Sequence, residues 1–158
     1  MSRFRELGSL RTKVLEKLIS SQELCKALQY DNSNYLNRET IDDPSSLLFN
    51  KIYPYNHVPE LSSDASSYVT FSFKEYRPTD NMKFKSALLH FQVLVHKDLI
   101  RTDYENLRYD DIIAAIDELF NDERILGIGK LEFYRMDEMF VNTNYVGYYL
   151  QYKLYEFK

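Results

Sequence analysis

The three histidines are the side chains in this sequence best suited to bind a metal ion. They are His57, His90 and His96. His90 and His96 share one face of an expected strand, but they are six residues apart, which corresponds to about 20 Å at the rise of a strand. Ligands so far apart cannot hold one ion, so the sequence predicts no metal site.

The single cysteine and two acidic pairs favour structural roles. Cys25 lies on an expected helix with no histidine near it in the sequence, which is typical of a buried thiol rather than a nucleophile. The pairs Asp42/Asp43 and Asp110/Asp111 stand at expected helix starts, where the helix dipole favours negative charge. No HExxH, CxxC, GxSxG, calcium loop or phosphate loop is present. We therefore expect no enzyme, no catalytic residue and no cofactor.

Length and composition indicate one globular domain, 1–158. The chain is 44% hydrophobic and 28% charged, with four glycines and four prolines, which excludes collagen-like and low-complexity proteins. One cysteine allows no disulfide within the chain and favours a reducing compartment. The apolar runs are far shorter than the roughly 18 residues of a membrane span. The N-terminus also lacks the apolar stretch of a signal peptide.

Three segments have the periodicity of amphipathic helices. Apolar residues recur every three or four positions over 4–19, 21–30 and 109–121. The first two form an N-terminal helical part, 1–30. An irregular insert over 31–67 follows, rich in Asp, Asn, Ser and Pro. A segment this long without regular structure is typical of a functional loop or of a segment ordered by a neighbour.

The remainder, 68–158, forms an α+β core in this interpretation. Alternation of apolar and polar residues over 68–76 and 87–97 predicts an antiparallel hairpin. The same pattern over 130–136 and 144–157 predicts two further strands. Together with the helices, these strands predict an α+β fold, a mostly antiparallel four-stranded sheet with helices packed on one face.

The last strand is unusually long. Over 144–157 it would span on the order of 45 Å, whereas typical strands have about five or six residues. We therefore expect something outside the subunit to cover part of it. Tyr145, Tyr149 and Tyr155 lie on the face opposite the expected helices, and tyrosine is enriched at half-wet interfaces. The alternative is that these tyrosines pair across the sheet.

Charge is distributed unevenly along the chain. The net charge is −4, but residues 1–30 carry six bases and three acids, and residues 98–123 carry nine acids and two bases. This favours a head-to-tail contact between copies, in which complementary potentials set the register. The alternative is that both segments are solvated helix faces. The predicted contact residues are Arg3, Arg5, Arg11 and Lys13 against Asp110, Asp111, Asp117 and Glu118.

The net negative charge argues against a dedicated nucleic-acid-binding protein. One loop, RPTDNMKFK, nevertheless carries Arg77, Lys83 and Lys85. In a ring, such a loop on each copy could face the channel and contact DNA through its phosphates, without reading sequence. The alternative is ordinary loop charge.

The second half of the chain resembles a known family. The segments FQVLVHKDL, YDDIIAAIDELFN, GIGKLEFYRM and NYVGYYLQYKLYEF follow in the order strand, helix, strand, strand. In the order of these elements and in their pattern of apolar and aromatic residues, 68–158 resembles the tail terminator, or tail completion, proteins of tailed bacteriophages. The resemblance implies a small α+β protein that assembles as a hexameric ring in the phage neck and has no catalytic residues.

The function implied by the resemblance is structural. The chain would be a virion protein, assembled in the host cytoplasm, that terminates the tail tube and joins it to the head. Its partners would be further copies of itself, the head connector or stopper protein and the tail tube protein. One alternative is another neck or baseplate component, such as a head completion protein. An alternative of a different class is a small cytosolic binding module or an enzyme of unknown substrate.

Overall fold

The computed structural model describes residues 2–127 and 129–157. Three α-helices and four short 3₁₀ helices accompany five strands. The helices are η1 Arg3–Glu6, α1 Leu7–Ile19, α2 Gln22–Gln29, η2 Tyr35–Asn37, η3 Pro44–Leu47, η4 Lys97–Leu99 and α3 Arg108–Phe120. The strands are β1 Ile52–Tyr53, β2 Ser67–Pro78, β3 Phe84–His96, β4 Glu132–Phe140 and β5 Tyr145–Phe157. No helix in the described part of the chain combines the length and the apolar character that crossing a bilayer requires.

The sheet confirms the predicted α+β class. Its strand order is β1-β2-β3-β5-β4, and every neighbouring pair is antiparallel except β1 and β2. The sequence predicted four strands. The fifth, β1, is a two-residue strand inside the irregular insert, too short to produce an alternating pattern. β3 pairs with β5 over the full length of both strands, so the long final strand has an equally long partner within its own chain.

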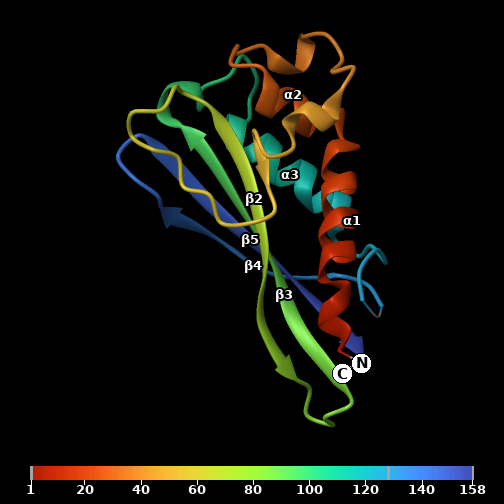
Figure 1. Cartoon of the computed structure of the whole chain (residues 1–158). Coiled ribbons are helices and arrows are strands. Elements are labelled where there is room, and N and C mark those ends of the chain that lie inside the picture. Colours follow the sequence, from red (N-terminus) through yellow and green to blue (C-terminus); the bar gives the residue numbers. More distant parts are fainter. Residues whose placement is uncertain (1, 128, 158) are drawn as a thin grey trace.

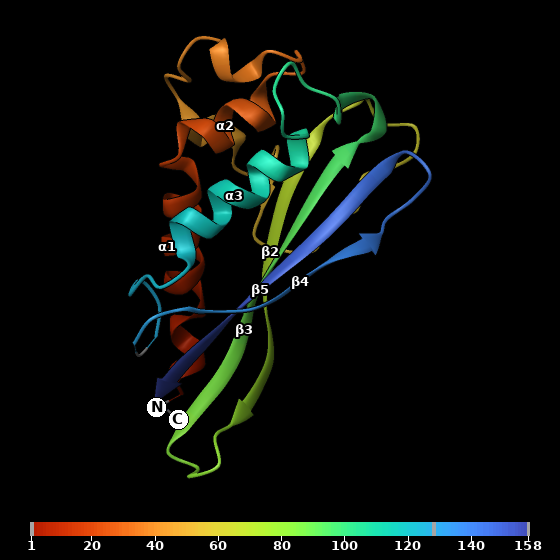
Figure 2. The same ribbon diagram turned by 180° about the vertical axis from the view of Figure 1, so that it is seen from behind.

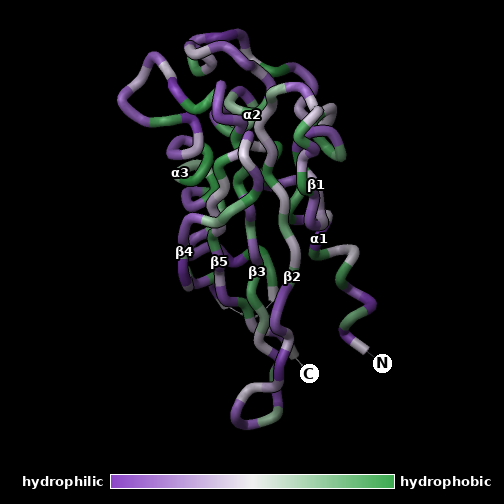
Figure 3. The backbone as a smooth tube through the Cα atoms, turned by 90° about the vertical axis from the view of Figure 1, so that its left-hand side faces the viewer, coloured by the Kyte–Doolittle hydropathy of each residue, from purple (hydrophilic) through white to green (hydrophobic). Residues whose placement is uncertain are grey.

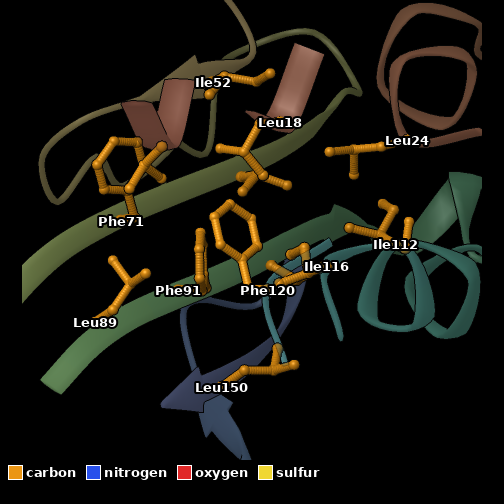
Figure 4. Packing of buried hydrophobic residues seen from close by; sticks show 14 of the residues in the cluster. Leu18, Leu24, Ile52, Phe71, Leu89, Phe91, Ile112, Ile116, Phe120 and Leu150 are labelled. Atoms are coloured by element: carbon orange, nitrogen blue, oxygen red, sulfur yellow. The ribbon is translucent and has the colours of Figure 1, made fainter. Parts of the chain in front are cut away.

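The three α-helices cover one face of the sheet (Figures 1 and 2). The core lies between these layers, where Phe71 and Phe91 of the sheet meet Phe120 of α3 (Figure 4). The ring centroids of Phe91 and Phe120 are 4.8 Å apart. Leu18 of α1 and Leu24 of α2 are fully buried in the same cluster. The helical periodicity therefore identified the faces that pack on the sheet.

The end of the irregular insert covers part of the opposite face. Asn142 donates a hydrogen bond to the carbonyl of Pro59 at 3.1 Å, and Asn144 donates to that of Leu61 at 3.1 Å. The insert is drawn in orange and yellow in Figure 1. This part of the insert is therefore ordered by contacts with its own sheet.

The glycines that follow α3 allow a matched test of backbone geometry. Gly127 and Gly129 both have positive φ angles, 61° and 77°. A Cβ atom on Gly127 would lie 2.1 Å from the carbonyl oxygen of Tyr155, whereas one on Gly129 would meet nothing within 4 Å. We expect Gly129→Ala to cost about 1 kcal/mol of unfolding free energy and Gly127→Ala clearly more, about 2 kcal/mol or above. Urea unfolding of both variants measures the difference, and equal losses would contradict the close approach.

Candidate subunit interface

The histidines and the cysteine do not form a reactive cluster. His90 and His96 are both buried on β3, and His57 stacks on Tyr53 with ring centroids 4.0 Å apart. Within 2–127 and 129–157, no group of three or more His, Cys, Asp or Glu residues is arranged to hold a metal ion. Burial raises the pKa of the Cys25 thiol to about 11, so it is a poor nucleophile at neutral pH.

His90 belongs to a polar network on the face of the sheet away from the helices. The amide oxygen of Gln92 accepts a hydrogen bond from the Thr70 hydroxyl at 3.2 Å. The Gln92 amide nitrogen lies 3.3 Å from His90 Nε2 and therefore donates to it. His90 Nδ1 lies 3.0 Å from the amide of Gln151. Burial first, and the charge of Lys74 second, lower the pKa of His90 to about 4, because both disfavour the protonated, charged ring.

This network predicts a loss of stability in acid. Unfolded histidine takes up a proton near its usual pKa of about 6.5, whereas folded His90 does so only near about 4. Its contribution is therefore fully present above about pH 6.5 and is lost as the pH falls toward 4, by up to about 3 kcal/mol. We expect His90→Gln to have a shallower dependence of unfolding free energy on pH over this range, measured by urea unfolding. Parallel curves for the two proteins would contradict the assignment.

A buried arginine that the sequence did not single out holds the helices together. Arg108, the first residue of α3, is fully buried, and its guanidinium lies 4.3 Å from the ring centroid of Tyr35. It donates 2.8 Å hydrogen bonds to the carbonyls of Leu99, Ala27, Tyr30 and Asn32. Arg108 is one of two bases in an acid-rich stretch, and its type and position alone could not predict these acceptors.

The four basic residues predicted for the interface lie on η1 and α1. Arg3 forms an ion pair with Glu6 at 2.8 Å, while Arg5, Arg11 and Lys13 are exposed. In the described part of the chain, no ion pair joins any of these bases to the acids of α3. The charges of Arg5, Arg11 and Lys13 therefore remain available to other molecules.

The four predicted acidic residues divide into two groups. Asp111 is buried, accepts a hydrogen bond from the Asn106 amide at 3.1 Å, and also accepts one from the Tyr35 hydroxyl. Asp110, Asp117 and Glu118 reach the surface of α3. Asp110 also accepts a hydrogen bond from the backbone amide of Leu107 at 2.9 Å, and Asp117 accepts one from the Tyr152 hydroxyl at 2.7 Å. Of the four, Asp111 is buried, Asp110 and Asp117 are half-buried, and Glu118 is exposed.

The three predicted tyrosines are less accessible than their sequence positions suggest. Tyr145 is buried and donates to the carbonyl of Asp64 at 3.3 Å. Tyr149 and Tyr155 are half-buried, and the Tyr149 hydroxyl accepts a hydrogen bond from Arg135 Nε at 3.1 Å. The aromatic face of β5 is therefore largely used inside the chain.

The predicted channel-facing loop is the turn between β2 and β3, which projects beyond the rest of the molecule (Figure 1). Its three bases do not act together. Arg77 forms an ion pair with Glu75 at 3.2 Å. The ammonium of Lys85 lies 4.2 Å from the ring centroid of Phe4. Lys83 is exposed in the turn.

An uncovered apolar surface lies on β4, which the sequence did not identify as an interface. This strand is the edge of the sheet beyond β5 and lies at one margin of the molecule in Figure 3. Phe133, Met136 and Phe140 are 51%, 45% and 84% exposed. Their β5 partners are Tyr152, Leu150 and Val146, of which Tyr152 and Leu150 are buried in the core. The three exposed side chains therefore share the helix-bearing face of the sheet.

A groove of about 500 Å³ separates α3 from β4. Ile113 and Ala114 of α3, with Leu150 of β5, contribute to its apolar lining, and Asp110 and Asp117 contribute acids. We define the acidic groove by these five residues together with Phe133 and Met136. The helix layer ends at α3, so the acidic groove is open to a partner.

The alternating pattern could not reveal this surface. The strand pattern over 130–136 placed Leu131 and Phe133 in the core. Leu131 is buried, but Phe133 is exposed because no helix lies over β4. Only the positions of the helices decide which apolar residues of a strand are covered.

The family model described as YomW matches residues 21–154. This range runs from the start of α2 into the end of β5, and the chain therefore belongs to the YomW family. No curated protein matches the sequence.

Proposed function

We propose that this YomW family member is a structural protein of a phage neck, forming a ring that terminates the tail tube and joins it to the head connector. The observation that carries the proposal is the uncovered edge strand β4. Four of its large side chains, Phe133, Tyr134, Met136 and Phe140, are at least 45% exposed. A monomer whose open edge strand exposes several large apolar side chains is liable to pair with other chains.

The charge distribution supports a closed assembly of like subunits. Exposed bases lie on α1, and α3 carries the exposed Glu118 with the half-buried Asp110 and Asp117. In a heterologous contact, one patch meets a different patch on the next copy, and a ring forms where the rotation closes. Oppositely charged surfaces on one chain suit this kind of contact, since they set orientation and suppress wrong pairings.

The phage assignment rests on two further arguments. Residues 68–158 resemble tail terminator proteins in the order of their elements, which the structure reproduces as β2, β3, α3, β4 and β5. The name YomW is of a type given to prophage genes. The histidines and the cysteine also suit a structural role. His57 stacks on Tyr53, His90 and His96 are buried on β3, and Cys25 is buried.

The test is electron microscopy of particles assembled without this chain. Interrupting its coding sequence in the phage or prophage that encodes it should yield separate filled heads and unjoined tails. Supplying the chain in trans should restore joined particles. Normal particles after the interruption would overturn the proposal. Tails that join heads but leak DNA would favour a head completion protein, and tails without tips would favour a baseplate component.

A further inference from the structure

We propose that the acidic groove receives the β2–β3 turn of a second copy, with Met82 as the inserted side chain. The inference rests on the proposed ring and names the contact that builds it. The turn is residues 79–83, between β2 and β3. Groove and turn lie on different parts of the same chain, as a heterologous contact requires.

The turn has an apolar side chain at its tip and positive charge around it. Met82 is 55% exposed and has a φ angle of 61°, a conformation that non-glycine residues seldom adopt. Residues 74–85 carry four bases, Lys74, Arg77, Lys83 and Lys85, against two acids, Glu75 and Asp80. The turn itself, 79–83, carries Asp80 and Lys83 and has no net charge, whereas the whole end of the hairpin, 74–85, has an excess of two positive charges around the flexible apolar side chain of Met82.

The acidic groove has the complementary character. Its polar rim includes Asp110 and Asp117. Burial, then Tyr148, then Asp110 and last Glu138 raise the pKa of Tyr109 beside the groove, so Glu138 also lies near it. In the described part of the chain none of these three acids has a basic partner within ion-pair distance. An apolar floor with an acidic rim fits Met82, which Lys83 and Lys85 follow in the sequence, since thioether side chains adapt to irregular apolar gaps.

The turn cannot reach the groove of its own chain. In Figures 1 and 2 the β2–β3 turn projects beyond one end of the molecule, away from α2 and α3. The acidic groove lies between α3 and β4, on the helix-bearing face of the sheet. The partner that brings such a turn to this groove is therefore another copy.

Cysteine cross-linking tests the contact directly. The native Cys25 is buried, so an added cysteine is the accessible thiol of each variant. We expect Met82→Cys mixed with Ala114→Cys to give a covalent dimer with a short bismaleimide, and the double variant to give a ladder of oligomers. Val58→Cys mixed with Ala114→Cys is the matched control, since Val58 is 58% exposed and lies in the insert.

A second variant keeps the test independent of cross-linker geometry. Met82→Asn removes the apolar tip, and asparagine tolerates a positive φ angle better than methionine does. We expect it to fold normally and to lose assembly at least tenfold, while Val58→Asn does not. If assemblies form but neither the ladder nor the loss is seen, another element fills the groove and this inference is wrong while the ring stands. If no assembly forms at any concentration, the ring and this contact both fail.

Discussion

Replacing Arg108 by methionine should destabilise the chain by about 3–5 kcal/mol. The guanidinium satisfies four buried carbonyls, from η4, from α2 and from the segment after it. Methionine fills part of the volume but donates no hydrogen bond, so these carbonyls would lose their partner away from water. Because the bonds connect α3 to α2 and η4, the loss should appear in global unfolding.

Two variants separate this effect from charge alone. Arg108→Lys keeps the charge, but an ammonium cannot match the fixed fork of a guanidinium, so we expect a loss of about 2 kcal/mol or more. Arg101→Met removes an exposed arginine nearby and should change stability by less than about 0.5 kcal/mol. Urea unfolding followed by circular dichroism measures all three, and a loss below 1 kcal/mol for Arg108→Met would contradict the role of Arg108.

Replacing Met136 and Phe140 together by threonine should abolish assembly at ordinary concentrations. Their exposure, 45% and 84%, means that the isolated chain loses little packing. In an assembly, covering two such side chains contributes about 3–5 kcal/mol per interface. That corresponds to a weakening of roughly 100-fold to 5000-fold. Threonine keeps the β propensity of the strand.

The control for this variant uses equally exposed side chains elsewhere. Val58 and Leu61 are each 58% exposed and lie in the insert, which contacts the turn after β4 but does not line the acidic groove. Val58→Thr with Leu61→Thr should leave assembly unchanged. Sedimentation velocity compares the two double variants with the parent chain, and urea midpoints confirm that both remain folded. If the β4 variant assembled as well as the parent chain, β4 would not be part of the interface.

Periodicity predicted the layers of this fold because each pattern reports one buried face. The helical pattern over 109–121 places Ile112, Ile116 and Phe120 in the core, where the structure has them. The alternation over 68–76 and 87–97 gives the β2–β3 hairpin with Phe71 opposite Phe91. Both predictions used only the spacing of apolar residues along a single helix or strand.

Features that depend on several elements at once could not be predicted. β1 exists because two residues of the insert meet β2 in parallel, a pairing between distant segments. Arg108 is buried by carbonyls contributed from three separate parts of the chain.

The length of β5 suggested that a neighbour covers it. In the structure, that length is matched by β3, and the uncovered apolar surface lies on β4, one strand further out. Charge patterning located the acids of α3. It could not show that Asp111 turns inward to Tyr35 and Asn106.

The most direct test of the central claim is the mass of the purified full chain in solution as a function of concentration. In the proposed ring, further copies cover the exposed surface along α3 and β4. The proposal predicts one closed species whose mass is a fixed multiple of 18.9 kDa, six-fold if the ring resembles those of tail terminators. A mass of 18.9 kDa at every concentration up to the limit of solubility would contradict it.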